Sequence, residues 1–382
     1  MLIFLGFLLL AIGAPTFGYD DPAAGTELMM TFLIHRHGDR TPIESSISYS
    51  TDSDALESLT KSYGYGQLTD EGKRTAYKLG KFIRSRYDEL LSEKYNKSEI
   101  YIRSTDSTRT KMTVLTAMST VYPAGGDNWS DEINWTPTPY TTVPVKYDFN
   151  EAMLNCPTFL SYYETASSSS ATSMDKFDDI LSEWSNYTGI NLTEYPAKAY
   201  SVYDVYTAQM SLGLPLSDDL MKIFPGIENA AGGAIDVVFG NDDYIKYQAG
   251  VLLNNFYNVT ETFINGDDTQ RVQIYSAHDF NVYSFMAVTQ ITPRQGVPKY
   301  GSAFALELRK VIDTGKYVVL AVFLKDPKTM EVLYLPVIGC DDLLCDYDTF
   351  KNATSSYSMD EDTWRSDCGW TADMTIDSSS ID

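Results

Sequence analysis

The strongest constraint on the fold is a continuous apolar run at residues 28–34 that ends abruptly in charged residues. Such a run is typical of a strand covered on both faces, as in the sheets of α/β proteins. A helix is expected from about Asp70, a short strand at 99–103, and a second helix from near Asp106 to Pro123. This alternation of strands and helices predicts an α/β fold with a mainly parallel sheet.

The middle of the chain differs in composition from both ends. Residues 146–265 are rich in Tyr, Ser and Asp and hold few β-branched runs, which predicts a smaller, mainly helical cap. Strand patterns return at 271–279, and three segments between 302 and 336 are expected to finish the sheet as antiparallel strands. The predicted α/β core is therefore discontinuous and consists of 19–145 and 266–382.

The first residues indicate export. The apolar run at 2–12 is too short to span a bilayer, and Gly18 is a suitable cleavage position, which predicts a signal peptide at 1–18. A buried N-terminal strand is the alternative, since no basic residue lies near Met1. We expect no membrane anchor, and a protein that is secreted or in the lysosomal lumen. The formal net charge of −23 argues against nucleic acid and anionic lipid as partners.

Sequons and cysteines agree with export. Seven N-x-[ST] sequons are glycosylation candidates: Asn96, Asn128, Asn134, Asn186, Asn191, Asn258 and Asn352. In an oxidising compartment the four cysteines are expected to pair. Cys340 and Cys345 are close enough in sequence to close a small loop, which leaves Cys156 with Cys368. Metal binding is the alternative, but no C-x-x-C spacing occurs and the chain has only three histidines, so no metal site is expected.

The first predicted strand leads into a loop, HRHGDRTP, whose residue types suit phosphate. Arg36 and Arg40 flank His37, and Gly38 lets the backbone turn tightly beside it. Guanidinium groups match phosphate oxygens in pairs. Positive neighbours also disfavour a protonated imidazole, so His37 is expected to stay neutral and nucleophilic below a pKa of about 6.5.

Two other predicted strands end in residues of the same kind. Arg103 lies at the end of the strand at 99–103, and His278 and Asp279 end the strand at 271–279. Ligands of α/β proteins bind at the carboxyl ends of parallel strands, so these side chains are expected to meet the loop around His37. A carboxyl group there is suited to give a proton to a departing alkoxide. The convergence predicts a phosphate-transfer site.

These motifs resemble a known family. RHGDRTP matches the R-H-G-x-R-x-P signature of the histidine acid phosphatases, and the likeness extends over nearly the whole mature chain. Further blocks follow in the order expected for the prostatic and lysosomal branch: GYGQLTDEGKRTAYKLG, IYIRSTDSTRT, the NCP around Cys156, YSAHD and the GC…C pair near Cys340. The resemblance implies a phosphoglycerate-mutase-like three-layer core with a cap, hydrolysis of phosphate monoesters, and no cofactor.

The resemblance also assigns roles to single residues. It makes His37 the nucleophile that forms a phosphohistidine and Asp279 the proton donor. The phosphate ligands that it implies are Arg36, Arg40, Arg103 and His278. It assigns nothing to His35, and Arg109 is expected to be mainly a structural salt-bridge partner. Because a protonated carboxyl is commoner at low pH, the assignment gives an acidic optimum a physical reason.

Three alternatives stay open at this point. A phytase shares the signature and prefers inositol hexakisphosphate, but needs more basic residues than 29 Lys plus Arg against 52 acids suggest. A phosphoglycerate mutase-like enzyme does not suit the sequons and cysteines, and a non-catalytic phosphate-binding protein needs no proton donor. The expected partners are small phosphomonoesters, with phosphoproteins as a second class. By resemblance to the prostatic enzyme a homodimer is an option that the sequence does not test.

Overall fold

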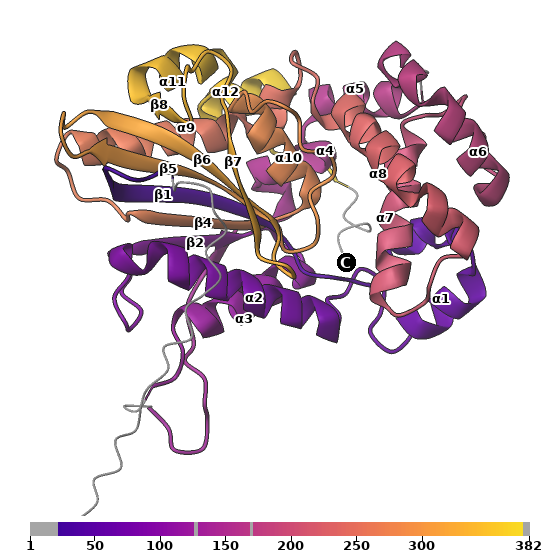
Figure 1. Cartoon of the computed structure of the whole chain (residues 1–382), viewed down its shortest axis with the longest axis horizontal. Coiled ribbons are helices and arrows are strands. Elements are labelled where there is room, and N and C mark those ends of the chain that lie inside the picture. Colours follow the sequence, from indigo (N-terminus) through magenta and orange to yellow (C-terminus); the bar gives the residue numbers. More distant parts are fainter. Residues whose placement is uncertain (1–21, 126–128, 169–170, 377–382) are drawn as a thin grey trace, which may run out of the picture.

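The computed structural model describes residues 22–125, 129–168 and 171–376; the predicted signal peptide 1–18 and the sequon residue Asn128 lie outside them. Its centre is an eight-stranded mixed sheet (Figure 1). The strands, in spatial order, are β3 (Thr141–Thr142), β2 (Ile100–Ser104), β4 (Val272–Ala277), β1 (Thr26–Arg36), β5 (Ala303–Val311), β6 (Tyr317–Asp326) and β7 (Glu331–Leu335), while β8 (Leu344–Asp346) also pairs with β6.

The pairing of the strands decides which ends meet. β1, β4, β2 and β3 pair in parallel, whereas β5 is antiparallel to β1, and β6 to β5. Since β6 thereby points the same way as β1, most strands share one direction, and the antiparallel finish predicted between 302 and 336 is confirmed. Arg36 stands opposite Ala277, and Ser104 opposite Ser276, so β1, β4 and β2 end at one edge of the sheet.

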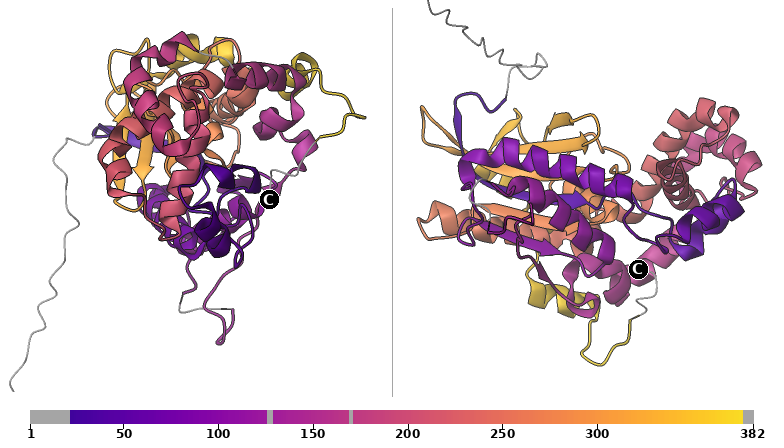
Figure 2. Two further views of the ribbon diagram at one scale, coloured as in Figure 1. Left: turned by 90° about the vertical axis from the view of Figure 1, so that its right-hand side faces the viewer. Right: turned by 90° about the horizontal axis from the view of Figure 1, so that it is seen from below.

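Helices cover both faces of the sheet and make the three layers expected (Figures 1 and 2). α2 (Asp70–Tyr87) and α3 (Thr108–Val121) bury Ile83 and Val114 against strand residues such as Leu33 on one face. On the other face lie α9 (Ile245–Ile264) and α10 (Asp279–Val288), where Phe256 and Phe285 pack against Phe32 with ring centroids 5.9 and 5.6 Å apart. The apolar strand predicted at 28–34 is thus covered on both sides.

A second group of helices lies beyond the carboxyl ends of the strands (Figures 1 and 2). We call it the lateral helices, which are α1 (Ser53–Thr60), α5 (Pro157–Ser168), α6 (Asp178–Thr188), α7 (Lys198–Ser211) and α8 (Asp218–Phe239). The cap predicted at 146–265 contains most of them, but it also contains α9, which packs on the sheet. The domain boundaries therefore stay a prediction.

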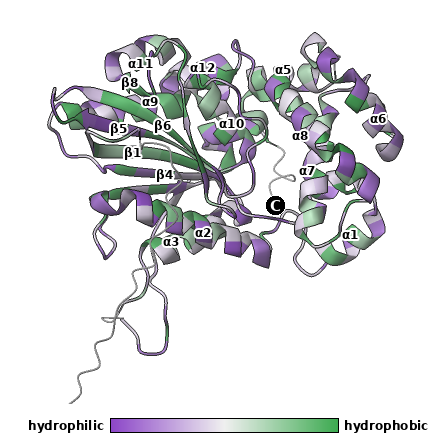
Figure 3. Cartoon of the chain, in the orientation of Figure 1, coloured by the Kyte–Doolittle hydropathy of each residue, from purple (hydrophilic) through white to green (hydrophobic). Residues whose placement is uncertain are grey.

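Hydropathy follows this arrangement. Figure 3 shows the central strands largely in the hydrophobic colour, whereas α2, α3 and the lateral helices alternate between hydrophobic and hydrophilic residues. This is the pattern of strands covered on both faces and helices covered on one. Within the part of the chain that the structure describes, no helix combines the length and apolarity needed to cross a bilayer.

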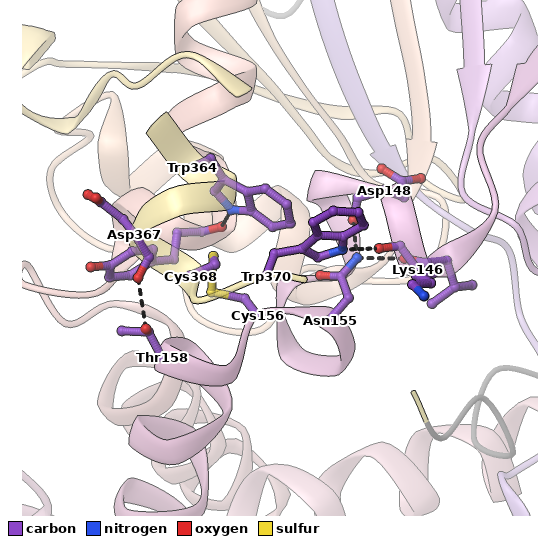
Figure 4. Close-up of a disulfide and its surroundings, with 11 residues drawn as sticks. Lys146, Asp148, Asn155, Cys156, Thr158, Trp364, Asp367, Cys368 and Trp370 are labelled. Carbon is purple, nitrogen blue, oxygen red and sulfur yellow. Dashed lines mark hydrogen bonds between the residues drawn. A yellow bond between two sulfur atoms is a disulfide. The ribbon is translucent and has the colours of Figure 1, made fainter. Parts of the chain in front are cut away.

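The structure contains two disulfides, both of them the predicted pairs: one ties the C-terminal region to the middle of the chain, and the other closes a small local loop. Cys156, which follows the short helix α4 (Ala152–Asn155), joins Cys368 at the end of α12 (Glu361–Cys368) (Figure 4). Beside it Trp370 Nε1 donates to the carbonyl oxygen of Lys146 at 2.8 Å. The second bond joins Cys340 to Cys345, ahead of α11 (Tyr347–Thr354).

Candidate active site

The loop after β1 is held rigidly against its neighbours. The backbone N–H of His37 donates to Ala277 O at 3.0 Å, and Gly301 N donates to His37 O at 2.9 Å. A Cβ on Gly38 would lie 2.3 Å from the carbonyl oxygen of Gly72 in the first turn of α2. Glycine is therefore required at position 38, because only a residue without a Cβ lets the loop approach the helix this closely.

The hydrogen bond of the His37 ring identifies its tautomer. Nδ1 lies 2.8 Å from the carbonyl oxygen of Gly38, which can only accept, so Nδ1 carries the proton and Nε2 keeps its lone pair. Burial, followed by the charges of Arg109, Arg36 and Arg40, holds the pKa of His37 well below its ordinary value. The ring thus stays neutral in acidic solution, as the sequence predicted.

Arg36 is fixed at several points. Its Nη1 donates to Pro298 O at 2.8 Å, and Nη2 lies 3.0 Å from both Asp204 Oδ1 and Asp279 Oδ2. The guanidinium carbon lies 4.1 Å from the ring centroid of Tyr300, a cation–π contact. The group is 3% exposed, so these contacts hold the guanidinium in one place.

Arg40 shares the same carboxylate. Its Nη2 donates to Asp204 Oδ2 at 2.7 Å, and its Nη1 donates to Thr41 O at 3.0 Å. The buried Nε atoms of Arg36 and Arg40 have no hydrogen-bond partner among the described residues. A buried donor without a partner is costly, so these N–H groups are suited to bind an anion.

His278 presents the opposite tautomer to His37. Its Nδ1 lies 3.4 Å from Nη2 of Arg109, which can only donate, so the proton is on Nε2. That nitrogen lies 3.0 Å from Thr105 Oγ1 and 3.3 Å from Glu151 Oε1. Burial and then the charge of Arg109 hold the pKa of His278 well below its ordinary value, so this imidazole is also neutral.

Two carboxyl groups lie close to the histidines. Asp279 is the first residue of α10, and its Oδ1 accepts from the backbone N–H of Phe280 at 2.9 Å. Burial raises the pKa of Glu151 to about 7, although the charge of Arg109 opposes the shift. Glu151 is therefore mostly protonated in acidic solution.

These groups line a cavity of about 360 Å³. The ionisable part of its lining consists of His37, Arg40, Arg109, Glu151, Asp204, His278 and Asp279. The rest is mostly apolar or aromatic, with Ile43, Tyr49, Met153, Leu154, Tyr163, Tyr200, Phe239 and Phe280. A neutral imidazole, guanidinium groups and a carboxyl group at one cavity can bind a tetrahedral anion and transfer it.

Two of the predicted phosphate ligands, Arg36 and Arg103, are not among the residues that line this cavity, whereas Arg40 and His278 are. Arg36 nevertheless contacts Asp204 and Asp279, which do line it. Arg103 stands opposite Tyr275, the level of Ile34 and two residues short of Arg36. Its Nη2 donates to Asp148 Oδ1 at 2.7 Å, and its guanidinium lies 4.3 Å from the ring centroid of Phe149.

Arg109, which was expected to be mainly structural, lines the cavity instead. It lies in the first turn of α3, which follows β2, so the helix and not the strand carries the arginine to the edge. The predicted start of this helix near Asp106 was the signal available in the sequence. His35 lies outside the cavity lining, as expected, and burial lowers its pKa to about 4.

Sequence reasoning missed Glu151, Tyr200 and Asp204. Asp204 and Tyr200 come from α7, and Glu151 ends the 3₁₀ turn at Phe149–Glu151. The Tyr- and Ser-rich sequence around these three residues contains no recognisable motif, so only the folded chain identifies them.

The chain is similar to known phosphatases over most of its length. The family model of the histidine phosphatase superfamily (branch 2) matches residues 27–322. Prostatic acid phosphatase of Bos taurus is 28% identical over 331 residues, covering 84% of this chain and 83% of that protein. Testicular acid phosphatase of Homo sapiens is 30% identical over 331 residues (82% and 76%), and lysosomal acid phosphatase of Xenopus laevis 30% over 332 residues (83% and 74%).

Solved structures share the fold at lower identity. The phytase of Klebsiella sp. ASR1 superimposes with a TM-score of 0.65 and 14% identity, covering 87% of this chain and 96% of that one. Hafnia alvei phytase in complex with myo-inositol hexakis sulphate gives a TM-score of 0.63 and 13% identity, with coverages of 88% and 98%. At this identity the likeness concerns the fold alone.

Proposed function

Because the chain belongs to the histidine phosphatase superfamily (branch 2), we propose that it is an acid phosphatase that hydrolyses phosphate monoesters through a phosphohistidine on His37. One observation carries the proposal. The Nδ1–H of His37 is bound to Gly38 O, which leaves Nε2 as the unprotonated nitrogen of a neutral ring that lines a cavity with Arg40 and Arg109.

The reaction has two displacements. His37 Nε2 attacks phosphorus, the bond from phosphorus to the ester oxygen breaks, and Asp279 gives its proton to the departing alkoxide. Water then attacks the phosphohistidine, Asp279 takes up a proton from that water, and the bond to Nε2 breaks to release orthophosphate. Arg36, Arg40 and Arg109 neutralise the charge on the phosphoryl oxygens, where preorganised donors are most effective.

The cavity lining favours a monoester with an organic leaving group over a polyphosphorylated inositol. Beyond the groups around His37 the described lining is mostly aliphatic, aromatic or hydroxylic, and it includes no lysine. A substrate with six phosphates needs additional cations, which this wall does not offer. Small phosphomonoesters, and phosphorylated side chains of proteins, are the substrate classes that fit.

The first test separates enzyme from binder. The wild-type protein should hydrolyse nitrophenyl phosphate with vanadate inhibition, and quenched turnover should yield a phosphoryl label that is stable to base, labile to acid and absent from His37→Ala. Binding of phosphate without turnover, or a label on another residue, would contradict the proposal. Faster hydrolysis of inositol hexakisphosphate than of nitrophenyl phosphate would favour the phytase alternative.

The role of Asp279 is tested by the leaving group. Asp279→Ala should lower kcat on alkyl phosphates by about 100-fold or more, because the alkoxide then departs without a proton. Nitrophenyl phosphate, whose leaving group needs no proton, should lose far less. Equal losses on both substrates would argue against a proton donor at 279.

Export completes the proposal. We infer that 1–18 is removed as a signal peptide and that the protein is secreted or lysosomal, in agreement with its two disulfides. The six described sequon asparagines are all exposed, which suits glycosylation: Asn96, Asn134, Asn186, Asn191, Asn258 and Asn352. Expression in secretory cells, followed by N-terminal sequencing and deglycosylation, tests cleavage and glycans, and the mass in solution distinguishes a monomer from a homodimer.

A further inference from the structure

α7 of the lateral helices places two polar side chains, one turn apart, against the proposed phosphate site. Tyr200 and Asp204 both line the cavity, and residues four apart share one face of a helix. The nearby charge of Asp279 adds to burial in raising the pKa of the Tyr200 phenol. The sheet edge therefore supplies the reacting groups, and a helix from elsewhere in the chain contacts them.

Asp204 makes the more consequential contact. Its Oδ1 lies 3.0 Å from Arg36 Nη2, and its Oδ2 lies 2.7 Å from Arg40 Nη2. The carboxylate thus bridges two guanidinium groups instead of pairing with one. Although burial opposes it, the charges of Arg40 and Arg36 lower the pKa of Asp204, so the bridge stays ionised in acidic solution.

We propose that Asp204 is a positioning residue that holds Arg36 and Arg40 at a fixed spacing, so that both bind one phosphoryl group in the transition state. The inference rests on the proposed phosphatase function.

The hydrogen bonds of the two arginines favour this role. The Nη atoms of Arg36 are engaged by Pro298 O, Asp204 and Asp279, and those of Arg40 by Thr41 O and Asp204. The Nε atoms remain buried and without a partner among the described residues. With the Nη side of each group fixed, the Nε–H donors are held in place for an incoming anion, which costs no reorganisation during the reaction.

Charge gives a second reason for a carboxylate at this position. Two adjacent buried guanidinium groups repel each other, and without a bridging anion they would separate or bind phosphate in varied geometries. A loosely held pair still attracts phosphate, but it no longer matches the trigonal arrangement of oxygens at the transition state. Removal of Asp204 should therefore impair kcat more than ground-state binding.

The experiment compares Asp204→Asn, Asp204→Glu and the matched control Asp148→Asn. Asp148 is also a buried carboxylate paired with an arginine, but it lies outside the cavity lining. For each variant we would measure kcat and KM on nitrophenyl phosphate, the inhibition constants of vanadate and orthophosphate, and the thermal midpoint.

Asp204→Asn should lower kcat about 10- to 100-fold with KM changed less than about threefold, since misplacement of a substrate-positioning group by about 1 Å has effects of this size. The inhibition constant of vanadate, a transition-state analogue, should rise far more than that of orthophosphate. Asp204→Glu keeps the charge and should recover part of both losses. Asp148→Asn should lower the thermal midpoint and leave kcat per folded molecule near the wild-type value.

Wild-type kcat and vanadate inhibition in Asp204→Asn would overturn the inference, and so would equal weakening of vanadate and orthophosphate. If Asp204→Asn does not fold, Asp204→Glu carries the test, because its longer side chain should still lower kcat and weaken vanadate selectively. Absence of turnover by the wild-type protein would instead refute the proposed phosphatase function, so the two failures are distinguishable.

Discussion

Among the described residues, two buried carboxylates each bind two arginines, and only one of these carboxylates lines the cavity. The edge cluster consists of Arg36, Arg40 and Asp204. The sheet cluster consists of Arg86, Glu307 and Arg309. Glu307 is fully buried in β5 and accepts from both of its arginines, while Arg309 Nε donates to Thr26 Oγ1 at 2.7 Å.

The difference lies in how completely the donors are used. In the sheet cluster Arg86 adds a bond to Tyr334 Oη at 3.3 Å, so protein atoms meet the guanidinium donors. In the edge cluster the Nε atoms of both arginines are left over beside a neutral imidazole. Burial of charge alone therefore does not mark a functional site; unsatisfied donors at a cavity do.

The largest expected effect concerns the edge. His37→Ala should lower kcat on nitrophenyl phosphate by at least about 10⁴-fold, because the nucleophile is removed. The thermal midpoint should change little, since Arg36, Arg40 and Asp204 keep their bonds to one another. Steady-state kinetics measure the loss of kcat, and a melting curve measures the thermal midpoint. Residual turnover above one per cent would contradict a catalytic role for the edge of the sheet.

The corresponding substitution in the sheet cluster should affect stability and not activity. Glu307→Gln should cost about 3 to 5 kcal/mol of unfolding free energy, because it leaves the buried Arg309 and the partly buried Arg86 with insufficient negative charge. Denaturant unfolding measures the loss, and kcat per folded molecule should stay at the wild-type level. A large fall of kcat with unchanged stability would mean that the sheet cluster also serves the reaction.

A smaller effect on kcat/KM should distinguish Arg109 on α3 from Arg103 on the neighbouring β2. Arg109→Gln should lower kcat/KM about 100-fold, as expected for loss of one charged donor to the phosphoryl group. Burial and then the charge of Arg109 lower the pKa of His37, so loss of that charge should raise this pKa. The acid limb of the pH profile should therefore move to higher pH. Arg103→Gln is the matched control and should retain kcat/KM; the reverse pattern would restore Arg103 as the phosphate ligand.

The smallest effect concerns His35, a buried histidine of β1 outside the cavity. Its pKa is about 4 in the folded protein against 6.5 ordinarily, so below pH 6.5 the unfolded chain takes up a proton that the folded chain does not. This group should therefore remove about 2 kcal/mol of stability between pH 7 and pH 5.

His35→Gln tests that sign. The variant should lose less stability than the wild type over the same pH interval, measured by denaturant unfolding at both pH values. Parallel curves for the two proteins would show that His35 does not contribute. The pH profile of kcat/KM should keep its shape, because His37 and not His35 lines the cavity.

Much of the fold followed from local pattern. The apolar run at 28–34 required cover on both faces, and the helices expected from Asp70 and near Asp106 are α2 and α3. His37 directly follows β1, and Asp279 follows β4 after one intervening residue, so their position near strand ends made both of them candidates. Position after a strand is a feature that hydrophobic periodicity reveals.

The site residues that the sequence did not predict correctly depend on strand register and on packing between distant parts of the chain. Arg103 lies one residue before the end of β2, and only the pairing with β4 shows that this level is two residues short of the edge. Asp204 reaches Arg36 across 168 positions of sequence, through a helix whose placement no local motif encodes. Such contacts arise from tertiary packing, which a single sequence does not display.

The bond between Cys156 and Cys368 has a consequence for survival among proteases. The connection between α6 and α7 exposes Thr193 and Glu194, and a cut there would put His37 on one fragment and Asp279 on the other. The bridge would keep both fragments in one covalent molecule, which migrates as a single band until a reductant divides it. A form cut at this connection should therefore keep His37 and Asp279 in one molecule and retain activity.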